Sequence, residues 1–381
     1  MTHRQLLSLV LVTLALFVSA CDVEVPSEGR LVIIGGGLSG ANEPVFQSIL
    51  QARQGEGPIC VIPTAGASPE SSMRSAVSRF ENHGGPGAAE GVLISEDNPE
   101  AAHDPTVVAT LNDCGGFFFT GGQQSRIARV FRPDGVASPA FQAVVERHAQ
   151  GAVVSGTSAG AAIMSDPMIS GGSSAGALER GVEGDGVRTM TGLGFLADAA
   201  VDQHFLARGR IGRLLVAVLQ KDEYTFGFGI DENTALAVEG DSVWTVGESG
   251  VVIVEGHEAV PAPEGNGGTG LRLYLLGDGD GYDMRHRRVF VDPAKQPLQQ
   301  VSGELDLPDD IYARWALLHV LDGLARTDVQ RVVLNAEGYD LILGKAEGFQ
   351  AHAWDQEGVQ GTPAGLTVGP FTVDLLKESG G

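Results

Sequence analysis

The feature that most constrains the fold is a short apolar run followed by a glycine-rich turn, a pairing that recurs along the first half of the chain. The runs cover residues 31–34, 58–63, 116–120 and 152–155, and helical patterns follow the first, third and fourth. Continuous apolar runs are typical of strands buried on both faces of a parallel sheet. Strands that alternate with helices therefore predict an α/β fold, a three-layer sandwich with helices on both faces of the sheet.

One of these turns has the pattern of a nucleophile elbow. Gly156-X-Ser158-X-Gly160 lies between the run at 152–155 and the helical stretch that begins at Ala161. Small flanking residues permit the sharp turn that lifts a serine hydroxyl clear of the sheet, and a following helix N-terminus favours negative charge. Because ligands collect at the carboxyl ends of such strands, we predict that Ser158 is a nucleophile rather than a structural serine.

A nucleophilic serine needs a base and an acid that orients it. His204 precedes a basic helical stretch and is the candidate base, although an isolated histidine more often has a core or capping role. Glu232 follows an apolar run and opens a turn. Asp231 and Asp202 compete with Glu232 as the acid, and their spacing does not separate the three.

Acyl transfer also needs backbone donors for the oxyanion. The amide of Ala159, next to the nucleophile, is one candidate. For the second we favour Gly121-Gly122, particularly Gly122, over Gly36-Gly37; the alternative for either pair is a plain tight turn.

We expect no cofactor and no metal. Gly35-Gly36-Gly37-X-X-Gly40 lacks the glycine order of a dinucleotide loop, and no acidic partner follows the next strand. The Asp/Gly segment 278–283 hints at a calcium loop, but Val289 stands where the bidentate glutamate would be needed. The cysteines and histidines do not have zinc-ligand spacing.

The charge excludes two classes of partner. With 25 Lys+Arg against 48 Asp+Glu, the chain has a formal charge of −23. A chain this acidic is unsuited to bind nucleic acid or an anionic membrane surface.

The N-terminus has the pattern of an export signal. His3 and Arg4 precede an apolar run, 6–18, that is short for a membrane span. Ser19-Ala20-Cys21 then resembles a lipobox, which predicts cleavage after residue 20, lipid attachment at Cys21 and a tether over 21–30. The only membrane association expected is this anchor, in the cell envelope, and ordinary secretion is the alternative.

Two further thiols, those of Cys60 and Cys114, could pair in an exported chain. Since both lie at predicted buried strands, unpaired core cysteines are the expected outcome.

The pattern of predicted secondary structure changes beyond about residue 229. Short strands of hairpin type are predicted at 235–238, 242–246 and 250–254, and a helix at 311–324, with Pro308 near its start. Residues 287–381 are predicted to form a small α+β appendage of unknown role.

Five ordered segments together resemble the cyanophycinase family of serine peptidases, relatives of aspartyl dipeptidase with a class I glutamine-amidotransferase-like fold. The resemblance runs from Leu31 to Asp283, which makes 31–286 the expected catalytic domain. Its carriers are Val61-Ile62-Pro63-Thr64-Ala65, Phe119-Thr120-Gly121-Gly122-X-Gln124, Gly156-Thr157-Ser158-Ala159-Gly160-Ala161, Asp202-Gln203-His204-Phe205 with Arg208, Arg210 and Arg213, and Gly229-Ile230-Asp231-Glu232-Asn233-Thr234-Ala235.

The resemblance implies roles for these residues. Ser158 would be the nucleophile, His204 the general base and Glu232 the acid that orients it. The substrate contacts would come from Gln124, Gln203, Arg208 and Arg210. The family substrate is cyanophycin, a poly-aspartate backbone with arginine on each β-carboxyl, which is cut to β-Asp-Arg dipeptides; a homodimer is also implied.

Three departures leave the substrate open. Thr157 stands where a dipeptidase would carry tryptophan, Gln123 replaces the family aspartate, and Gly171-Gly172-Ser173-Ser174 lacks the usual glutamate. An envelope peptidase for other aspartyl or isoaspartyl peptides is therefore one alternative, and a surface binding protein without turnover is another.

Overall fold

The first of two large sheets contains the predicted parallel strands. The computed structural model describes residues 29–378. The nine strands of this sheet have the order β16-β15-β11-β10-β1-β5-β4-β2-β3. Its parallel part consists of β1 (Leu31–Ile34), β2 (Ile59–Ile62), β3 (Ala89–Gly91), β4 (Gly116–Phe119) and β5 (Val153–Thr157). Its antiparallel part consists of β10 (Thr234–Glu239), β11 (Ser242–Gly247), β15 (Gly281–Asp283) and β16 (Arg288–Phe290).

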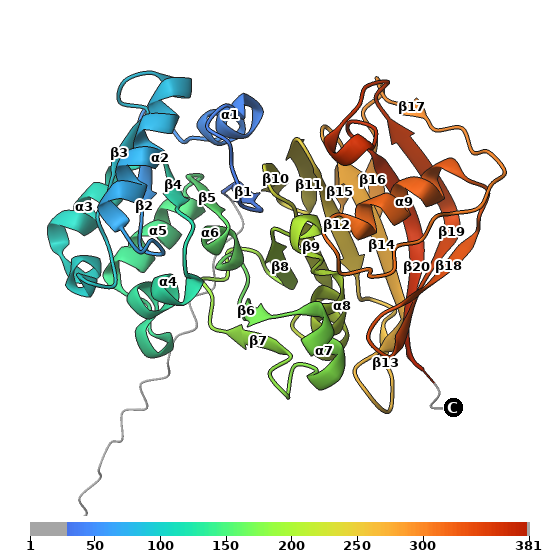
Figure 1. Cartoon of the computed structure of the whole chain (residues 1–381). Helices are drawn as coiled ribbons and strands as arrows, with labels where there is room; N and C mark the ends of the chain where they lie inside the picture. Colours follow the sequence, from blue (N-terminus) through green and yellow to red (C-terminus); the bar gives the residue numbers. More distant parts are fainter. Residues whose placement is uncertain (1–28, 379–381) are drawn as a thin grey trace, which may run out of the picture.

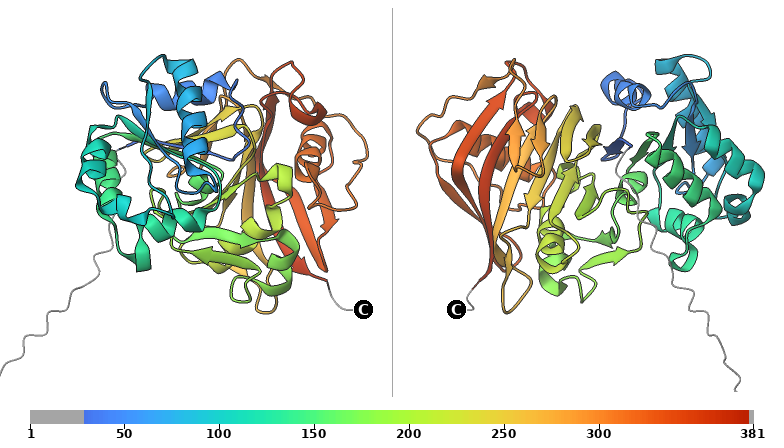
Figure 2. Two further views of the ribbon diagram at one scale, coloured as in Figure 1. Left: turned by 60° about the vertical axis from the view of Figure 1, so that its left-hand side comes forward. Right: turned by 180° about the vertical axis from the view of Figure 1, so that it is seen from behind.

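Helices cover both faces of the parallel part, as expected for a three-layer α/β sandwich (Figures 1 and 2). Ile34 points to one face, where it joins the cluster of Phe46 from α1 (Glu43–Gln51) and Phe80 from α2 (Pro69–Gly84). Ile33 points to the other face and joins the cluster of Phe131 and its neighbours. The helices on that face are α3 (Pro105–Asp113), α4 (Gln124–Phe131) and α5 (Pro139–Ala149). Alternate residues of a strand face opposite sides, which is why these runs are apolar throughout.

A disulfide crosses from the sheet to one helical layer. Cys60 of β2 is bonded to Cys114, the residue that follows α3, with a Cα–Cα distance of 5.8 Å. The expectation of two unpaired core cysteines was therefore wrong. Both residues are buried, so burial alone did not distinguish a free thiol from a paired one.

The second sheet joins the two parts of the chain. Its order is β17-β19-β20-β14-β12-β9-β8, with β13 paired to β14 and β18 to β19. The strands from the first part are β8 (Ala199–Gln203), β9 (Phe226–Ile230), β12 (Gly250–Glu255), β13 (Val260–Pro261) and β14 (Gly268–Gly277). Those after residue 290 are β17 (Gln296–Pro297), β18 (Arg331–Asn335), β19 (Tyr339–Ala353) and β20 (Thr367–Lys377).

The C-terminal α+β extension, residues 287–378, is thus continuous with the rest of the molecule. β20 pairs antiparallel with β14, between Gly268↔Leu375 and Leu275↔Val368. Side chains of α8 (Ile211–Gln220) and α9 (Ala316–Arg326) share one hydrophobic core with this sheet. At the Asp/Gly turn, Lys295 Nζ lies 2.8 Å from Asp280 Oδ2, with both side chains fully buried. This ammonium group stands beside the acidic residues that had hinted at calcium.

The helix of the extension starts later than the sequence pattern predicted. Residues 311–315 are outside α9, which begins at Ala316, so the predicted start near Pro308 was wrong. Trp315 has a φ of 66° and donates its backbone N–H to Leu206 O at 3.0 Å. This bend docks segment 311–315 on the chain just after His204.

The remaining elements include α6 (Ala159–Ala162), β6 (Met168–Gly172), α7 (Ser174–Arg180), β7 (Val187–Met190) and the 3₁₀ turn Leu206–Arg208. Within residues 29–378, no helix is both long and apolar enough to cross a bilayer. The same residues contain no group of three or more His, Cys, Asp or Glu side chains arranged to hold a metal ion.

Candidate active site

Ser158 lies at a strained turn between β5 and α6. Its φ of 53° and ψ of −107° fall in a region that side chains rarely adopt. The two flanking glycines explain how the turn closes: a Cβ at Gly156 would lie 2.3 Å from Gly160 O, and one at Gly160 would lie 2.2 Å from Phe119 O. Such strain is typical of functional turns and presents the hydroxyl above the sheet.

Three side chains from distant segments form a hydrogen-bonded chain. Ser158 Oγ lies 2.9 Å from His204 Nε2, and His204 Nδ1 lies 2.7 Å from Glu232 Oε1. His204 follows β8 and Glu232 follows β9, strands that pair in parallel and therefore end together. The end of β1 holds the backbones of Ser158 and His204 together. Ser158 N–H donates to Ile34 O, and His204 N–H donates to Gly35 O.

The two competing carboxylates have other partners. Asp202 is buried and accepts a 2.6 Å hydrogen bond from Arg213 Nε. Asp231 accepts from Ala207 N at 2.9 Å and from Ser249 Oγ at 2.7 Å. Burial raises the pKa of Asp231 to about 6, against the lowering effect of these hydrogen bonds. Among the three candidate acids, Glu232 is the one that contacts the imidazole.

The triple glycine after β1 accommodates this chain of side chains. Gly36 has a φ of +107°, and a Cβ there would lie 2.3 Å from His204 Cε1. At Gly37, with a φ of +58°, a Cβ would lie 3.2 Å from Glu232 Cβ. Sequence reasoning missed this role, since a glycine run at a strand end looks the same whether it makes a turn or makes room for an imidazole.

Of the two glycines predicted for the oxyanion site, Gly121 lies beside the nucleophile and Gly122 lies against Ala65. A Cβ at Gly121 would lie 3.4 Å from Ser158 Cβ, whereas Gly122 packs on Ala65 O, 2.0 Å from its ideal Cβ position. The amides of Gly122 and Ala159 donate in none of the turn and loop hydrogen bonds found for residues 29–378. Neither amide is thus engaged in a turn or loop hydrogen bond of the described residues.

The environment of His204 favours the neutral form of the ring. Burial lowers the pKa of His204 below its usual range; the hydrogen bond to Glu232 opposes this, and the Arg208 charge adds to it. A neutral imidazole with one nitrogen facing a hydroxyl can accept that proton at neutral pH.

A cavity of about 400 Å³ opens at Ser158 and His204. Two lining residues were not predicted from the sequence. Arg79 of α2 is held by a hydrogen bond to Leu38 O, and Thr120 has a buried hydroxyl without a hydrogen-bond partner among the described residues. Arg79 is one of several basic residues on helices, so the sequence carried no signal that would single it out.

The predicted substrate residues divide into two groups. Gln124 Nε2 donates to Ile169 O at 3.2 Å, and Gln203 Oε1 accepts from Arg210 Nη1 at 3.0 Å, so both amides already have protein partners. Arg210 also lies 3.3 Å from Asp202 Oδ1, and burial lowers its pKa to about 10. Arg208 is exposed and lies closest in sequence to His204. The predicted lipid attachment residue, Cys21, lies outside the described residues.

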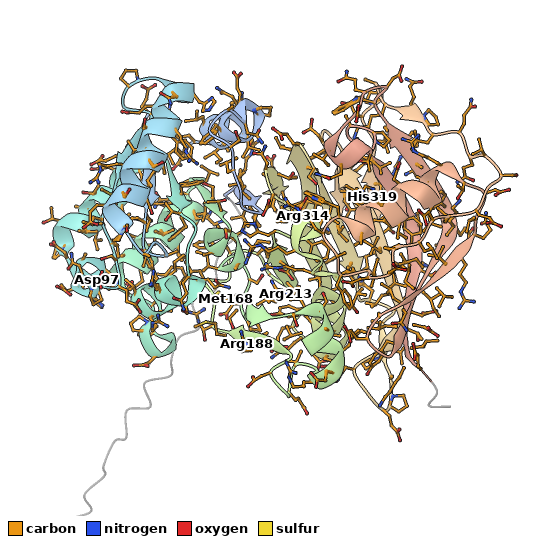
Figure 3. The ribbon with its side chains drawn as sticks, viewed as in Figure 1. Asp97, Met168, Arg188, Arg213, Arg314 and His319 are labelled. Atoms are coloured by element: carbon orange, nitrogen blue, oxygen red, sulfur yellow. A yellow bond between two sulfur atoms is a disulfide. The ribbon has the colours of Figure 1, made fainter. Side chains whose placement is uncertain are left out.

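The extension also reaches this site. Arg314 Nη2 lies 3.9 Å from Glu232 Oε2, a contact that no sequence pattern indicated. Figure 3 labels Arg314 near the middle of the molecule.

Sequence comparison relates the chain to a known family of peptidases. The profile of Peptidase family S51 matches residues 31–246. The cyanophycinase of Nostoc sp. is 33% identical over 241 residues, which cover 61% of this chain and 77% of that protein. That of Synechococcus elongatus is 33% identical over 239 residues, covering 61% and 71%. A solved peptidase structure from an acI-B1 Actinobacterium aligns with a TM-score of 0.49 and 21% identity, over 67% of this chain and 96% of that one.

Proposed function

The chain belongs to peptidase family S51, a family of serine-type peptidases, and on that basis we propose that Ser158, His204 and Glu232 are its catalytic triad. We further propose that its substrate is cyanophycin, the aspartyl-arginine polymer, which it cleaves to β-Asp-Arg dipeptides. The observation that carries the proposal is the chain of two hydrogen bonds, of 2.9 and 2.7 Å, that runs from hydroxyl through imidazole to carboxylate.

In the proposed mechanism, His204 Nε2 takes the Ser158 proton while Oγ attacks the amide carbonyl that follows a β-linked aspartyl residue. The Gly122 and Ala159 amides donate to the oxyanion of the tetrahedral intermediate. His204 then protonates the leaving amine, and an acyl-enzyme remains on Ser158. Water, deprotonated by His204, hydrolyses this ester and regenerates the hydroxyl. Glu232 holds the imidazole tautomer and stabilises the imidazolium that forms in both halves.

The curated relatives support the choice of substrate, because those with 33% identity are cyanophycinases. The charges at the site fit it as well. Arg79 lines the cavity at Ser158, and Arg208 lines a second cavity. Both can bind aspartyl carboxylates, since guanidinium groups pair with carboxylates bidentately.

The decisive experiment incubates the purified protein with insoluble cyanophycin granules and analyses the released products by mass spectrometry. We expect β-Asp-Arg dipeptides, and a rate at least about 10⁴-fold lower for Ser158→Ala. Release of dipeptides by the variant near the wild-type rate would refute the assignment of the nucleophile.

One observation favours a second substrate class, other aspartyl or isoaspartyl peptides. Gln123, which replaces the family aspartate, is exposed at the start of α4. A panel of two-unit substrates, in which two β-aspartyl dipeptides are joined through the aspartyl backbone amide and the side-chain-linked residue is varied, separates the two: cyanophycin activity predicts a strong preference for arginine, and the alternative predicts little preference.

We also propose that the protein is exported and anchored through a lipid on Cys21. The support is the sequence pattern of residues 3–21, since the structure describes residues from 29 on. Fractionation tests this, with wild type in the membrane fraction and Cys21→Ser released. Recovery of both proteins in the same soluble fraction would contradict the anchor.

A further inference from the structure

A second cavity, of about 390 Å³, lies next to the proposed triad and has walls from both parts of the chain. The part that matches the family supplies Arg208, Arg210 and residues 172–175. The extension supplies Asp310, Tyr312 and Glu337. We call this cavity the extension pocket. Its size is within the range of pockets that bind small ligands, roughly 300–1,000 Å³.

The extension pocket is adjacent to the reacting groups. Arg208 closes the 3₁₀ turn that begins just after His204, and its backbone N–H donates to His204 O at 3.1 Å. The Arg208 charge also lowers the pKa of His204. Segment 311–315 of the extension continues to Arg314, 3.9 Å from Glu232. These contacts connect the wall that carries Arg208 to His204, and the segment that carries Tyr312 to Glu232.

The walls of the pocket are held in place by backbone contacts. Gly209 has a φ of +56°, and any Cβ there would lie 1.8 Å from Tyr312 O, so the two loops touch directly. Ser174 Oγ donates to Gly209 O at 2.7 Å and accepts from Gly212 N at 3.0 Å. Asp310 Oδ1 accepts from Tyr312 N at 2.8 Å, which orients the acidic wall.

The two walls carry opposite charges. Arg210 is already bonded to Asp202 and Gln203, whereas Arg208 is exposed and makes no ion pair with the residues of 29–378. On the other wall, Asp310, Tyr312 and Glu337 line the cavity together, and burial and then the charges of Glu337 and Asp310 raise the pKa of Tyr312. That hydroxyl is buried and has no hydrogen-bond partner among the described residues.

We propose that the extension pocket is a specificity site for a zwitterionic substrate unit: Asp310 and Glu337 bind a guanidinium group, and Arg208 binds a carboxylate. The Tyr312 hydroxyl supplies a further polar contact. This inference deepens the proposed function and rests on it, because it assigns the arginine side chain of a β-Asp-Arg unit to the C-terminal extension. The family match ends at residue 246, so Asp310 and Glu337 are outside the matched region.

The test removes the two charges without changing shape. Asp310→Asn with Glu337→Gln keeps an oxygen to accept from Tyr312 N–H, and we expect it to lower kcat/KM for a substrate of two joined β-Asp-Arg units by about 10- to 100-fold, mainly through KM. With citrulline in place of arginine, wild type should lose a similar factor, whereas the double variant should discriminate little between the two. Asp309→Asn with Glu347→Gln removes the same charge from exposed residues that do not line the pocket, and it should behave as wild type.

A binding experiment separates this inference from the proposed triad. Calorimetry with the Ser158→Ala protein and β-Asp-Arg measures the pocket without turnover, and affinity should fall when the Asp310 and Glu337 changes are added. If cyanophycin is not cleaved but the dipeptide binds in this charge-dependent way, the proposed cyanophycinase activity fails and the pocket stands. If the double variant keeps the wild-type preference for arginine over citrulline and the same affinity, the extension pocket is refuted.

Discussion

In the first sheet, parallel strands of three to five residues are buried between helices, and in the second sheet antiparallel strands of up to 15 residues join the extension to the body of the chain. Strand ends that carry the proposed chemistry belong to the part that matches the family: Ser158 after β5, His204 after β8 and Glu232 after β9. The extension contributes Arg314 and one wall of a pocket. In the proposed division of labour, the part that matches the family cleaves the bond and the extension selects the substrate.

Substitution of the proposed triad acid should have the largest effect. Glu232→Gln removes the negative charge and can present an amide N–H to His204 Nδ1, so the wrong tautomer is populated and kcat should fall by about 10³- to 10⁴-fold. Initial rates on a saturating substrate of two joined β-Asp-Arg units measure kcat. The matched control is Asp231→Asn, which changes the adjacent carboxylate but leaves the imidazole untouched, and its rate at pH 7 should stay within a few-fold of wild type. Equal losses in the two variants would contradict the role assigned to Glu232.

The glycine that accommodates the imidazole provides the next test. Gly36→Ala places a methyl group 2.3 Å from His204 Cε1, so the ring must move and kcat should fall by at least about 100-fold. Gly87→Ala is the control, because Gly87 has a similar backbone strain, with a φ of +80°, and no atom within 4 Å of its ideal Cβ position. Circular dichroism and kinetics on both variants distinguish ring displacement from strain. An active Gly36→Ala enzyme would mean that the observed ring position is not required.

A change in the extension should affect stability and leave the nucleophile unchanged. Lys295→Met leaves Asp280 buried without its counter-charge, and the free energy of unfolding should fall by about 3–5 kcal/mol. Urea denaturation measures this, with Lys377→Met as a control at an exposed lysine of the same region. Under conditions where the protein stays folded, a small neutral fluorophosphonate should label Ser158 as fast as in wild type. A large fall in the labelling rate of the folded variant would break the proposed division of labour.

The smallest expected effect is a shift in pH dependence. Arg208 lowers the pKa of His204, so Arg208→Gln should raise it. A general base works in its neutral form, and the acid limb of the Ser158 labelling rate should therefore move to higher pH. Arg180→Gln, at an exposed arginine of α7, should leave the limb in place. A shift toward lower pH would contradict the electrostatic role given to Arg208.

Much of the first sheet could be predicted because its signals are local. The runs at 31–34, 59–62 and 116–119 are strands as expected, since uninterrupted apolar residues between glycine turns leave little alternative. The choice among Asp202, Asp231 and Glu232 could not be made from spacing. Adjacent residues at a strand end point in opposite directions, and only the fold shows that Asp202 faces Arg213 while Glu232 faces the imidazole.

The extension was less predictable because its structure depends on non-local pairing. The contact of β20 with β14 joins residues about 100 positions apart, and no local pattern specifies it. Segment 311–315 has helical spacing, yet the docking of Trp315 on Leu206 holds it out of the helix. The extension pocket needs both features, so Asp310 and Glu337 were not singled out from the sequence.

The most direct measurement of the central claim is active-site labelling of the full protein with a fluorophosphonate, followed by peptide mass mapping. The account predicts one adduct, on Ser158, that disappears in His204→Ala and persists when Asp310 and Glu337 are neutralised. An adduct on a different residue, or Ser158 labelling that is equally fast without His204, would contradict it.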